Sequence, residues 1–228
     1  MAQQIFLVRH GETEWSRSGQ HTGRTDIPLT AEGQAQAQGL GRFLRRKALA
    51  QFSTFREATA TQSSGTGLPV DGSVMPHELS RLALAVRTSP LLRARETCRL
   101  AGYASDAVVD EDLREWDYGI YEGRTTLEIR KGNPDWSIWL SPIPNGESLE
   151  QVAARARQVI ARAVEAETDV ALFAHGHILR ILAACWIGLP PITGRSLALD
   201  TATVSVLGYE RQTRVIRHWN VSPPALPT

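Results

Sequence analysis

Short apolar runs alternate along this chain with segments whose apolar residues recur at helical spacing. Three of the runs, Ile5–Val8, Leu82–Val86 and Val170–Phe173, predict buried strands. Helical patterns separate them, as in units where a helix connects two parallel strands of one sheet. The alternation therefore predicts an α/β fold.

Three helices can be placed from their start signals. Thr30 predicts the N-cap of a helix that runs to about Lys47. Ser89 and Pro90 predict the N-cap and the first position of a second helix. Ser148-Leu149-Glu150-Gln151 matches the capping-box pattern and predicts the start of a third.

The remaining apolar segments complete the expected sheet and its helices. Ile178–Ile187 predicts a mostly apolar helix that ends at Gly188, and Val108-Val109 predicts a short strand. Thr203–Leu207 and Val215–Trp219 alternate like strands around a tight polar turn. This pattern predicts an antiparallel hairpin at one edge of the sheet.

The length of 228 residues fits a single domain, which we expect over residues 1–222 with a loose tail at 223–228. Both helical and strand patterns fail from about 48 to 80, where Thr, Ser, Gly and Pro gather. This segment is predicted to be a surface insertion, either an inert loop or a lid over the site.

Charge, hydropathy and cysteine content narrow the class of partner. The 25 basic and 24 acidic residues give a net charge of +1, which attracts no nucleic acid. The longest apolar stretch, Ile181–Leu189, is far below the ~20 residues that cross a bilayer, and Arg9 interrupts the N-terminal run. Cys98 and Cys185 lie in apolar helical contexts. We therefore expect free thiols in a cytoplasmic protein that binds neither membrane nor nucleic acid.

The three predicted buried strands all end near residues that can bind or transfer phosphate. Arg9-His10-Gly11 follows the first strand and His175-Gly176-His177 follows the third; Arg93 lies in the first turn of the helix after the second. Because the carboxyl ends of neighbouring parallel strands meet at one edge of a sheet, His10, His175 and Arg93 are expected to converge.

These side chains suit phosphoryl transfer. Arginine forks match phosphate oxygens, and the positive end of the helix after Ser89 is expected to point at the same place. An imidazole is a competent nucleophile, and cationic groups stabilise the transition state without a metal. The leaving oxygen needs a proton, for which Glu115 and Asp117 are the candidate acids.

Taken singly, the same residues allow other interpretations. His175-Gly176-His177 is also compatible with a metal site, but no further ligand stands at metal-site spacing, so no metal is expected. A serine triad lacks its Gly-x-Ser-x-Gly motif, and the glycines form neither a P-loop nor a dinucleotide fingerprint.

Taken together and in order, the motifs resemble those of the histidine phosphatase superfamily, in its phosphoglycerate-mutase-like branch. The segments that carry the resemblance are Leu7–Trp15, His21–Asp26, Thr88–Ala94, Glu115–Gly119 and Ala174–Gly176. They span nearly the whole chain except about 48–80 and the last few residues. The resemblance implies a three-layer α/β sandwich around a mostly parallel sheet with an antiparallel edge strand.

The same resemblance implies roles for individual residues. His10 becomes the phosphohistidine; Arg9, Arg93 and His175 form the phosphate pocket; Glu115 is the proton donor. The implied substrate-binding residues are Ser16, Thr22, Gly23, Tyr118 and His177. Since Glu115 must begin protonated, hydrolysis is expected to be fastest at mildly acidic pH.

Departures from the family pattern favour hydrolysis over transfer. Ser16 and His177 stand where cofactor-dependent phosphoglycerate mutases usually carry Asn, and the segment Arg124–Glu147 is short and holds three basic residues. The motifs are similar to those of acid phosphatases and fungal sedoheptulose-1,7-bisphosphatases of this branch. The implied activity is a metal- and cofactor-independent phosphomonoesterase for small phosphorylated metabolites, including sugar phosphates and bisphosphates.

Two alternatives and one assembly question stay open at this stage. A phosphoglycerate mutase would share the catalytic residues and require 2,3-bisphosphoglycerate. A non-catalytic module would use the same pocket to recognise a phosphorylated partner. The hairpin at 203–219 offers an edge through which two copies can pair, so a homo-oligomer is also compatible with the sequence.

Overall fold

The computed structural model of the chain describes residues 3–44 and 84–223. The insertion expected at 48–80 lies outside the described residues, as does the expected tail apart from residue 223. In chain order the elements are β1 (Ile5–Arg9), α1 (Glu14–Ser18), a helix over 31–44, β2 (Leu84–Thr88), α4 (Leu92–Leu100), β3 (Ala107–Val109), η1 (Glu111–Leu113), η2 (Gly119–Tyr121), α5 (Thr126–Arg130), α6 (Leu149–Glu165), β4 (Asp169–Ala174), α7 (Gly176–Trp186), η3 (Pro191–Ser196), β5 (Val204–Glu210) and β6 (Thr213–Val221).

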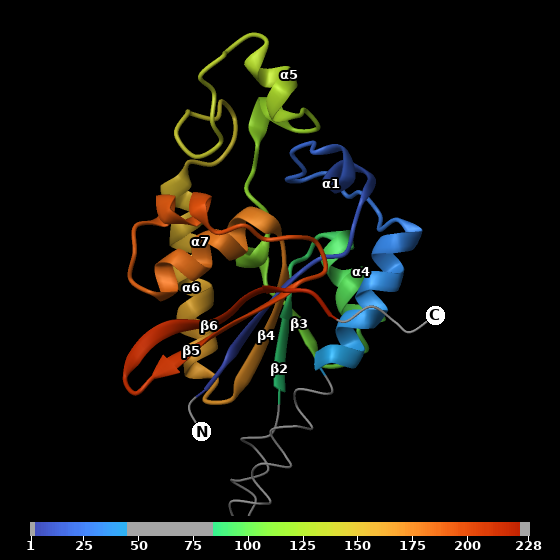
Figure 1. The fold of residues 1–228 in the computed structure, drawn as a ribbon, viewed down its shortest axis with the longest axis vertical. Helices are drawn as coiled ribbons and strands as arrows, with labels where there is room; N and C mark the ends of the chain where they lie inside the picture. Colours follow the sequence, from blue (N-terminus) through green and yellow to red (C-terminus); the bar gives the residue numbers. More distant parts are fainter. Residues whose placement is uncertain (1–2, 45–83, 224–228) are drawn as a thin grey trace, which may run out of the picture.

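The strands form one sheet in the order β3-β2-β4-β1-β5-β6. The first four of these are parallel, and β5 pairs antiparallel with both β1 and β6. The three predicted buried strands are therefore adjacent, and the predicted hairpin lies at the sheet edge (Figure 1).

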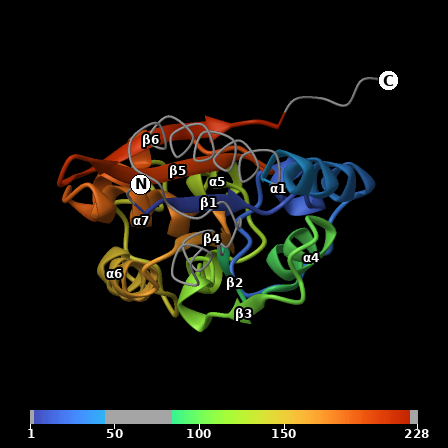
Figure 2. The ribbon, with the colours of Figure 1, turned by 90° about the horizontal axis from the view of Figure 1, so that it is seen from below.

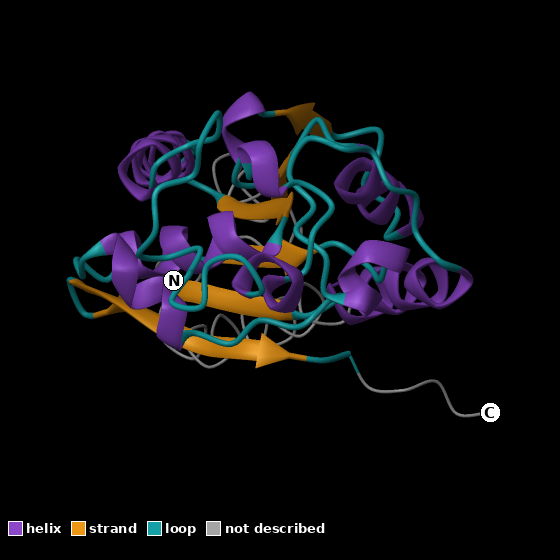
Figure 3. Cartoon of the chain, turned by 90° about the horizontal axis from the view of Figure 1, so that it is seen from above, coloured by secondary structure: helices purple, strands orange, loops and turns teal. Residues whose placement is uncertain are grey.

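Helices cover both faces of the sheet. Figure 2 shows α6 and α7 on one side and α4 with the helix over 31–44 on the other, and Figure 3 shows the same layers from above. Successive residues of β1 face different layers: Ile5 and Leu7 pack in the cluster with α6 and α7, and Phe6 and Val8 pack in the second cluster. The predicted three-layer sandwich is confirmed.

Two of the three predicted helix starts are confirmed. The Thr30 hydroxyl oxygen accepts a hydrogen bond from the N–H of Gly33 at 3.0 Å, and Ser148 forms a capping box with Gln151. The prediction for Ser89 is wrong, because α4 begins at Leu92. The Ser89 hydroxyl lies 2.7 Å from a ring nitrogen of His175 instead.

Element boundaries differ where polar residues continue an element. The strand β2 continues to Thr88 and does not end at Val86, because Arg87 and Thr88 still pair with β4. The predicted start of this strand, at residues 82 and 83, lies outside the described residues. The apolar helix α7 begins at Gly176, two residues earlier than predicted. Within the described residues, none of the helices combines the length and the apolar character that a membrane span requires.

Residues 119–146 form a long excursion above the carboxyl edge of the sheet, with α5 at its top (Figure 1). Its two ends meet in a narrow neck, where the N–H of Ile120 donates to the Pro144 carbonyl oxygen at 3.1 Å. Gly119 has a φ of +49°, and a Cβ there would lie 2.1 Å from that oxygen and 2.6 Å from the nitrogen of Gly146. The neck therefore requires glycine at position 119. The excursion also pairs with the segment that follows α1.

Candidate active site

The carboxyl edge of the sheet brings together the three residues that the strand ends predict. His10 follows β1, His175 follows β4, and Arg93 lies in the first turn of α4 after β2. The ring centroids of His10 and His175 are 5.2 Å apart, and the two residues are 5% and 1% exposed. The site thus stands on adjacent parallel strands, as expected.

His10 is held as a neutral imidazole with a defined tautomer. Its Nδ1 lies 2.7 Å from the carbonyl oxygen of Gly11, and because a carbonyl only accepts, Nδ1 carries the proton. Burial, together with the charges of Arg93 and Arg9, lowers the pKa of His10 well below its ordinary value. The lone pair therefore sits on Nε2, the nitrogen that can act as a nucleophile.

Gly11 is required by the close approach of two backbone segments. A Cβ at this position would lie 2.3 Å from the carbonyl oxygen of Gly33 at the start of the helix over 31–44. The contact holds the carbonyl of Gly11 in place, and with it the tautomer of His10.

Arg93 is a fully buried cation that organises the pocket, with 0% of the residue exposed. Its Nε donates to Nδ1 of His175 at 3.1 Å, and its two terminal nitrogens donate to the carbonyl oxygens of Thr22, Gly23 and Thr25 at 2.8–3.1 Å. Four of its five N–H groups are thus used, which leaves one for a ligand.

His175 is neutral and has the opposite tautomer to His10. Because a guanidinium donates to its Nδ1, the ring proton is on Nε2, which lies 2.7 Å from the Ser89 hydroxyl. Burial and the Arg93 charge lower the pKa of His175 well below its ordinary value. Sequence reasoning missed this role of Ser89, because its position before Pro90 matched a helix cap.

Arg9 has a buried N–H donor that is not used within the described part of the chain. One of its terminal nitrogens donates to the carbonyl of Leu199, whereas its Nε is buried and has no hydrogen-bond partner among the residues that the structure describes. The guanidinium packs on Gly176, whose added Cβ would lie 3.4 Å from Cζ of Arg9. An oxyanion in the pocket would satisfy this Nε, which otherwise costs free energy.

Glu115 lies at the amino end of α7. Its carboxylate accepts hydrogen bonds from the backbone N–H groups of Trp116, His177 and Ile178 at 2.9–3.0 Å. Burial alone would raise the pKa of Glu115, but its interactions with His177 and His175 hold the pKa well below the ordinary value. The helix start stabilises the negative charge in the same direction.

The amino ends of two helices, α4 and α7, bind carboxylates near the site. The first N–H of α4, that of Leu92, donates to the Asp26 carboxylate at 2.8 Å. The amino end of α7 binds the carboxylate of Glu115. The expectation for α4 assumed that its first turn began at Ser89, one turn too early.

Of the two candidate acids, Asp117 is committed to local contacts. Its carboxylate pairs with Arg24 and accepts the N–H of Gly119 at 3.1 Å. Both acids border a cleft of about 380 Å³, which is lined by Gly23, Arg24, Leu91, Arg114, Glu115, Asp117 and Glu147.

The five residues implied as substrate-binding have different surroundings. Tyr118 and His177 are joined by a 2.8 Å hydrogen bond between the phenol and Nδ1. Thr22 and Gly23 lie in the loop held by Arg93. Ser16 is the exception, because its hydroxyl bonds both the N–H and the carbonyl of Thr13 at 2.9 Å in the capping box of α1.

Sequence reasoning also missed two acidic residues that shape the site. Glu122 accepts the N–H groups of Gly23 and Thr25 at 2.9–3.1 Å, which fixes the loop beneath Arg93. Glu147 contacts the segment around Glu115. Both stand on the excursion or at its base and are far in sequence from their partners, so no local pattern marks them.

A metal-binding constellation is not found in the described part of the chain, where no group of three or more His, Cys, Asp or Glu side chains could hold an ion. Both ring nitrogens of His175 are engaged by Arg93 and Ser89, and Nδ1 of His177 is engaged by Tyr118. The geometry of these histidines is that of a hydrogen-bonded pocket.

Comparison with known proteins finds one family and several relatives of known structure or name. The family pattern described as histidine phosphatase superfamily (branch 1) matches residues 5–62 and 77–222. An acid phosphatase of Mycobacterium tuberculosis is 35% identical over 92% of this chain and 88% of its own length. Sedoheptulose 1,7-bisphosphatase of Saccharomyces cerevisiae is 37% identical over 81% of this chain and 67% of its own length. The solved structure of an open reading frame product from Mycobacterium tuberculosis is 33% identical, with a TM-score of 0.79 over 98% of this chain and 100% of that one.

Proposed function

The chain belongs to the histidine phosphatase superfamily (branch 1) and is a phosphoric monoester hydrolase, and from that premise we propose that it hydrolyses small phosphorylated metabolites through a phosphohistidine on His10. The observation that carries the proposal is the state of His10. Its Nδ1 proton is held by Gly11, and its pKa is lowered by burial and by two arginines, so Nε2 is a neutral nucleophile inside a cationic pocket.

The proposed reaction has two steps. Nε2 of His10 attacks the phosphorus in line, a P–N bond forms, and the bond from phosphorus to the leaving oxygen breaks while Glu115 transfers a proton to that oxygen. Water then attacks the phosphohistidine, Glu115 takes a proton from it, and the P–N bond breaks to give inorganic phosphate. Arg9, Arg93 and His175 surround the transferred group. The two arginines supply cationic N–H donors that stabilise the charge on its oxygens, and the neutral His175 holds the guanidinium of Arg93 in place.

Hydrolysis is favoured over transfer by the basic residues of the excursion. Arg130 donates to the carbonyl of Trp136 at 2.9 Å, and Arg124 contacts the carbonyl of Glu128. These local contacts support a role for both guanidinium groups within the excursion and not in binding a substrate carboxylate. A mutase needs such binding to retain its intermediate against water.

Sugar phosphates and sugar bisphosphates are the proposed substrate class. Support comes from the relative named for sedoheptulose 1,7-bisphosphate, at 37% identity. The pocket also presents polar groups beside the phosphate site, among them Tyr118, His177 and the backbone of Thr22 and Gly23. Such groups can bind hydroxyls of a leaving sugar.

The proposal includes no metal, no cofactor and no macromolecular partner, and places the enzyme in the cytoplasm. Cys98 and Cys185 are free thiols, which supports a reducing compartment. Pairing of two copies through the edge strand β6 is the proposed route to a homo-oligomer.

The test of the function is phosphate release from a panel of compounds, with and without EDTA. The panel contains sedoheptulose 1,7-bisphosphate, fructose 1,6-bisphosphate, 3-phosphoglycerate and p-nitrophenyl phosphate. Release that is strongest for a sugar phosphate, unchanged by EDTA and inhibited by vanadate, is the expected result. Interconversion of phosphoglycerates faster than phosphate release, stimulated by 2,3-bisphosphoglycerate, would establish the mutase instead.

The rate is expected to rise as the pH falls toward mildly acidic values. Glu115 is ionised in the free enzyme at neutral pH, since its pKa is lowered, whereas the donor role requires its proton. His10 stays neutral in the same range because its pKa is also lowered. We therefore expect kcat/KM to increase by up to about tenfold per pH unit between about pH 8 and 5.

The matched control for this pH profile is Glu115→Gln, measured with the same substrate and buffers. Protonation of the substrate affects both enzymes equally, so the difference between the two profiles belongs to Glu115. The variant is expected to be slower by about 10²- to 10⁴-fold and to lose that part of the pH dependence. A wild-type rate that keeps climbing above neutral pH would contradict the assignment.

A further inference from the structure

We propose that Arg155 is a positioning residue for the proton donor: it holds the backbone on both sides of Glu115 against α6, so that the carboxyl group meets the leaving oxygen. The inference rests on the proposed role of Glu115 in phosphoester hydrolysis. It assigns a function in catalysis to a side chain that lies behind the site, on a helix with no catalytic residue of its own.

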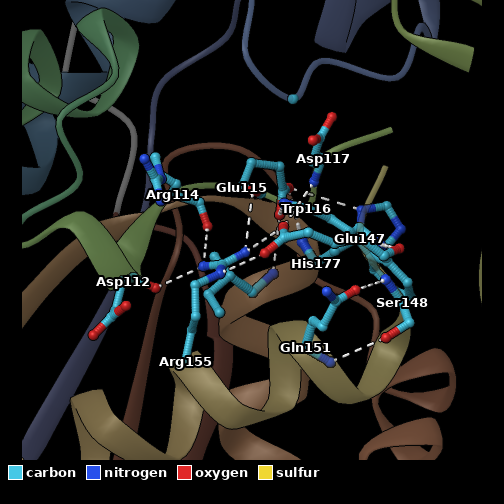
Figure 4. Close-up of polar contacts among 12 residues, drawn as sticks. Asp112, Arg114, Glu115, Trp116, Asp117, Glu147, Ser148, Gln151, Arg155 and His177 are labelled. Atoms are coloured by element: carbon cyan, nitrogen blue, oxygen red, sulfur yellow. Dashed lines mark hydrogen bonds and ion pairs between the residues drawn. The ribbon is translucent and has the colours of Figure 1, made fainter. Parts of the chain in front are cut away.

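All five N–H groups of Arg155 donate to the residues around Glu115 and to Glu147. Its Nε and Nη2 donate to the two carboxylate oxygens of Glu147, each at 2.8 Å. Nη1 donates to the carbonyl oxygens of Asp112 and Arg114 at 2.7 and 2.9 Å, and Nη2 also reaches the carbonyl of Glu115 at 3.4 Å. The Arg155 side chain is 12% exposed, so most of these bonds are partly buried. Figure 4 shows Arg155 among its partners.

Glu147 binds the residues that follow Glu115 in the sequence. The same carboxylate that binds Arg155 accepts the N–H of Asp117 at 3.0 Å. The Glu147 carbonyl accepts the indole N–H of Trp116 at 2.8 Å, and its own N–H donates to the Asp117 carbonyl at 3.0 Å. Figure 4 shows Arg155 and Glu147 enclosing the backbone of residues 114–117.

This arrangement separates two tasks. The amino end of α7 fixes the carboxylate of Glu115, and Arg155 fixes the backbone from which that side chain extends. Proton transfer requires the donor within about 3 Å of the leaving oxygen, and a shift of about 1 Å can lower a rate by about 10²-fold. Loss of Arg155 should therefore weaken proton donation while the nucleophile and the phosphate pocket stay in place.

Arg162 is a matched control on the same helix. It lies two turns further along α6, and among the described residues its hydrogen bonds go to the carboxylates of Asp110 and Asp112, at 2.7–3.2 Å. Arg162 thus connects α6 to the segment that follows β3, but at residues that precede those flanking Glu115 in the sequence. A loss of packing or charge on this face of α6 would affect Arg162→Met and Arg155→Met alike.

The experiment is a leaving-group series, with kcat/KM measured for phenyl phosphates whose phenols range from weakly to strongly acidic. This quantity reports the first phosphoryl transfer, and only poor leaving groups need the proton. Arg155→Met is expected to lose about 10- to 100-fold on phenyl phosphate and less than about threefold on 2,4-dinitrophenyl phosphate. Glu115→Gln should show a still steeper dependence, and Arg162→Met should keep that of the wild type. Arg155→Lys, which retains a charge opposite Glu147, should fall between wild type and Arg155→Met.

Three outcomes overturn the inference. Equal losses across the series would mean that Arg155 supports the fold without positioning the acid. Wild-type behaviour of both Arg155 variants would mean that the hydrogen bonds of Arg155 are dispensable for catalysis. If Glu115→Gln itself shows no leaving-group dependence, Glu115 is not the proton donor. That result would overturn the proposed role of Glu115, whereas the first two outcomes would overturn only the role of Arg155. If Arg155→Met does not fold, as thermal unfolding would reveal, the series for Arg155→Lys decides between these outcomes.

Discussion

Alanine in place of His10 is expected to lower kcat on the order of 10⁵-fold and to eliminate the phosphoenzyme. The reason is that Nε2 of His10 supplies the electron pair of the P–N bond. The neighbouring imidazole of His175 is not a substitute, because Arg93 and Ser89 engage its two ring nitrogens. The arginines remain, so the variant should still bind inorganic phosphate and vanadate.

Rapid quenching of the reaction with a labelled substrate measures both kcat and the amount of phosphoenzyme. The quench is alkaline, because a phosphohistidine is labile in acid and stable in alkali. The matched control is His218→Ala, which removes an exposed imidazole on β6 and should behave as wild type. Turnover at the wild-type rate in the His10 variant would refute the covalent mechanism. If the His10 variant still forms the normal amount of labelled phosphoenzyme but does not turn over, His10 acts in hydrolysis of the phosphoenzyme and is not the nucleophile.

Lysine in place of Arg93 is expected to damage both activity and stability, although the charge is kept. Arg93 donates to three carbonyl groups and to His175 from one rigid fork, and an ammonium on a flexible stem cannot reproduce these directions. We expect kcat/KM to fall by about 10²- to 10³-fold. The free energy of unfolding should drop by about 3 kcal/mol, because buried acceptors lose their donors.

Arg95→Lys on the same helix provides the comparison, since Arg95 is exposed. That variant should change neither denaturant midpoint nor kinetics. A second readout is the state of His175, whose Nδ1 loses its donor. In Arg93→Lys its imidazole should titrate closer to the ordinary pKa of histidine in NMR spectra, and an unchanged titration would contradict the assigned hydrogen bond.

The parts of the site that could be predicted are those carried by the parallel strands. His10, His175 and Arg93 each follow an apolar run, and parallel pairing brings such strand ends to one edge whatever the details of packing. Periodicity and cap signals were likewise sufficient for α6 and the edge hairpin. These features depend on local sequence and on one topological rule.

The parts that could not be predicted depend on contacts between distant segments. Ser89 matches a helix cap by sequence, yet its hydroxyl bonds His175, 86 residues away, and the helix starts later. Arg155 looks like an ordinary helix surface cation, but it binds carbonyls 40 or more residues earlier. Backbone carbonyls are present at every position, so a sequence carries no sign of which ones a buried guanidinium will reach.

The narrow neck at Gly119 has a consequence for how enzymes of this shape can diversify. Since the excursion leaves and returns at one point, the chain entropy lost on its closure grows only slowly with its length. Among its residues, Glu122 is tied to the phosphate site, because it fixes the loop that Arg93 binds. The part of the excursion beyond Glu122 can therefore be exchanged, with Glu115, Glu122 and Glu147 kept. The phosphate site is then retained, while the surface offered to the leaving group can change.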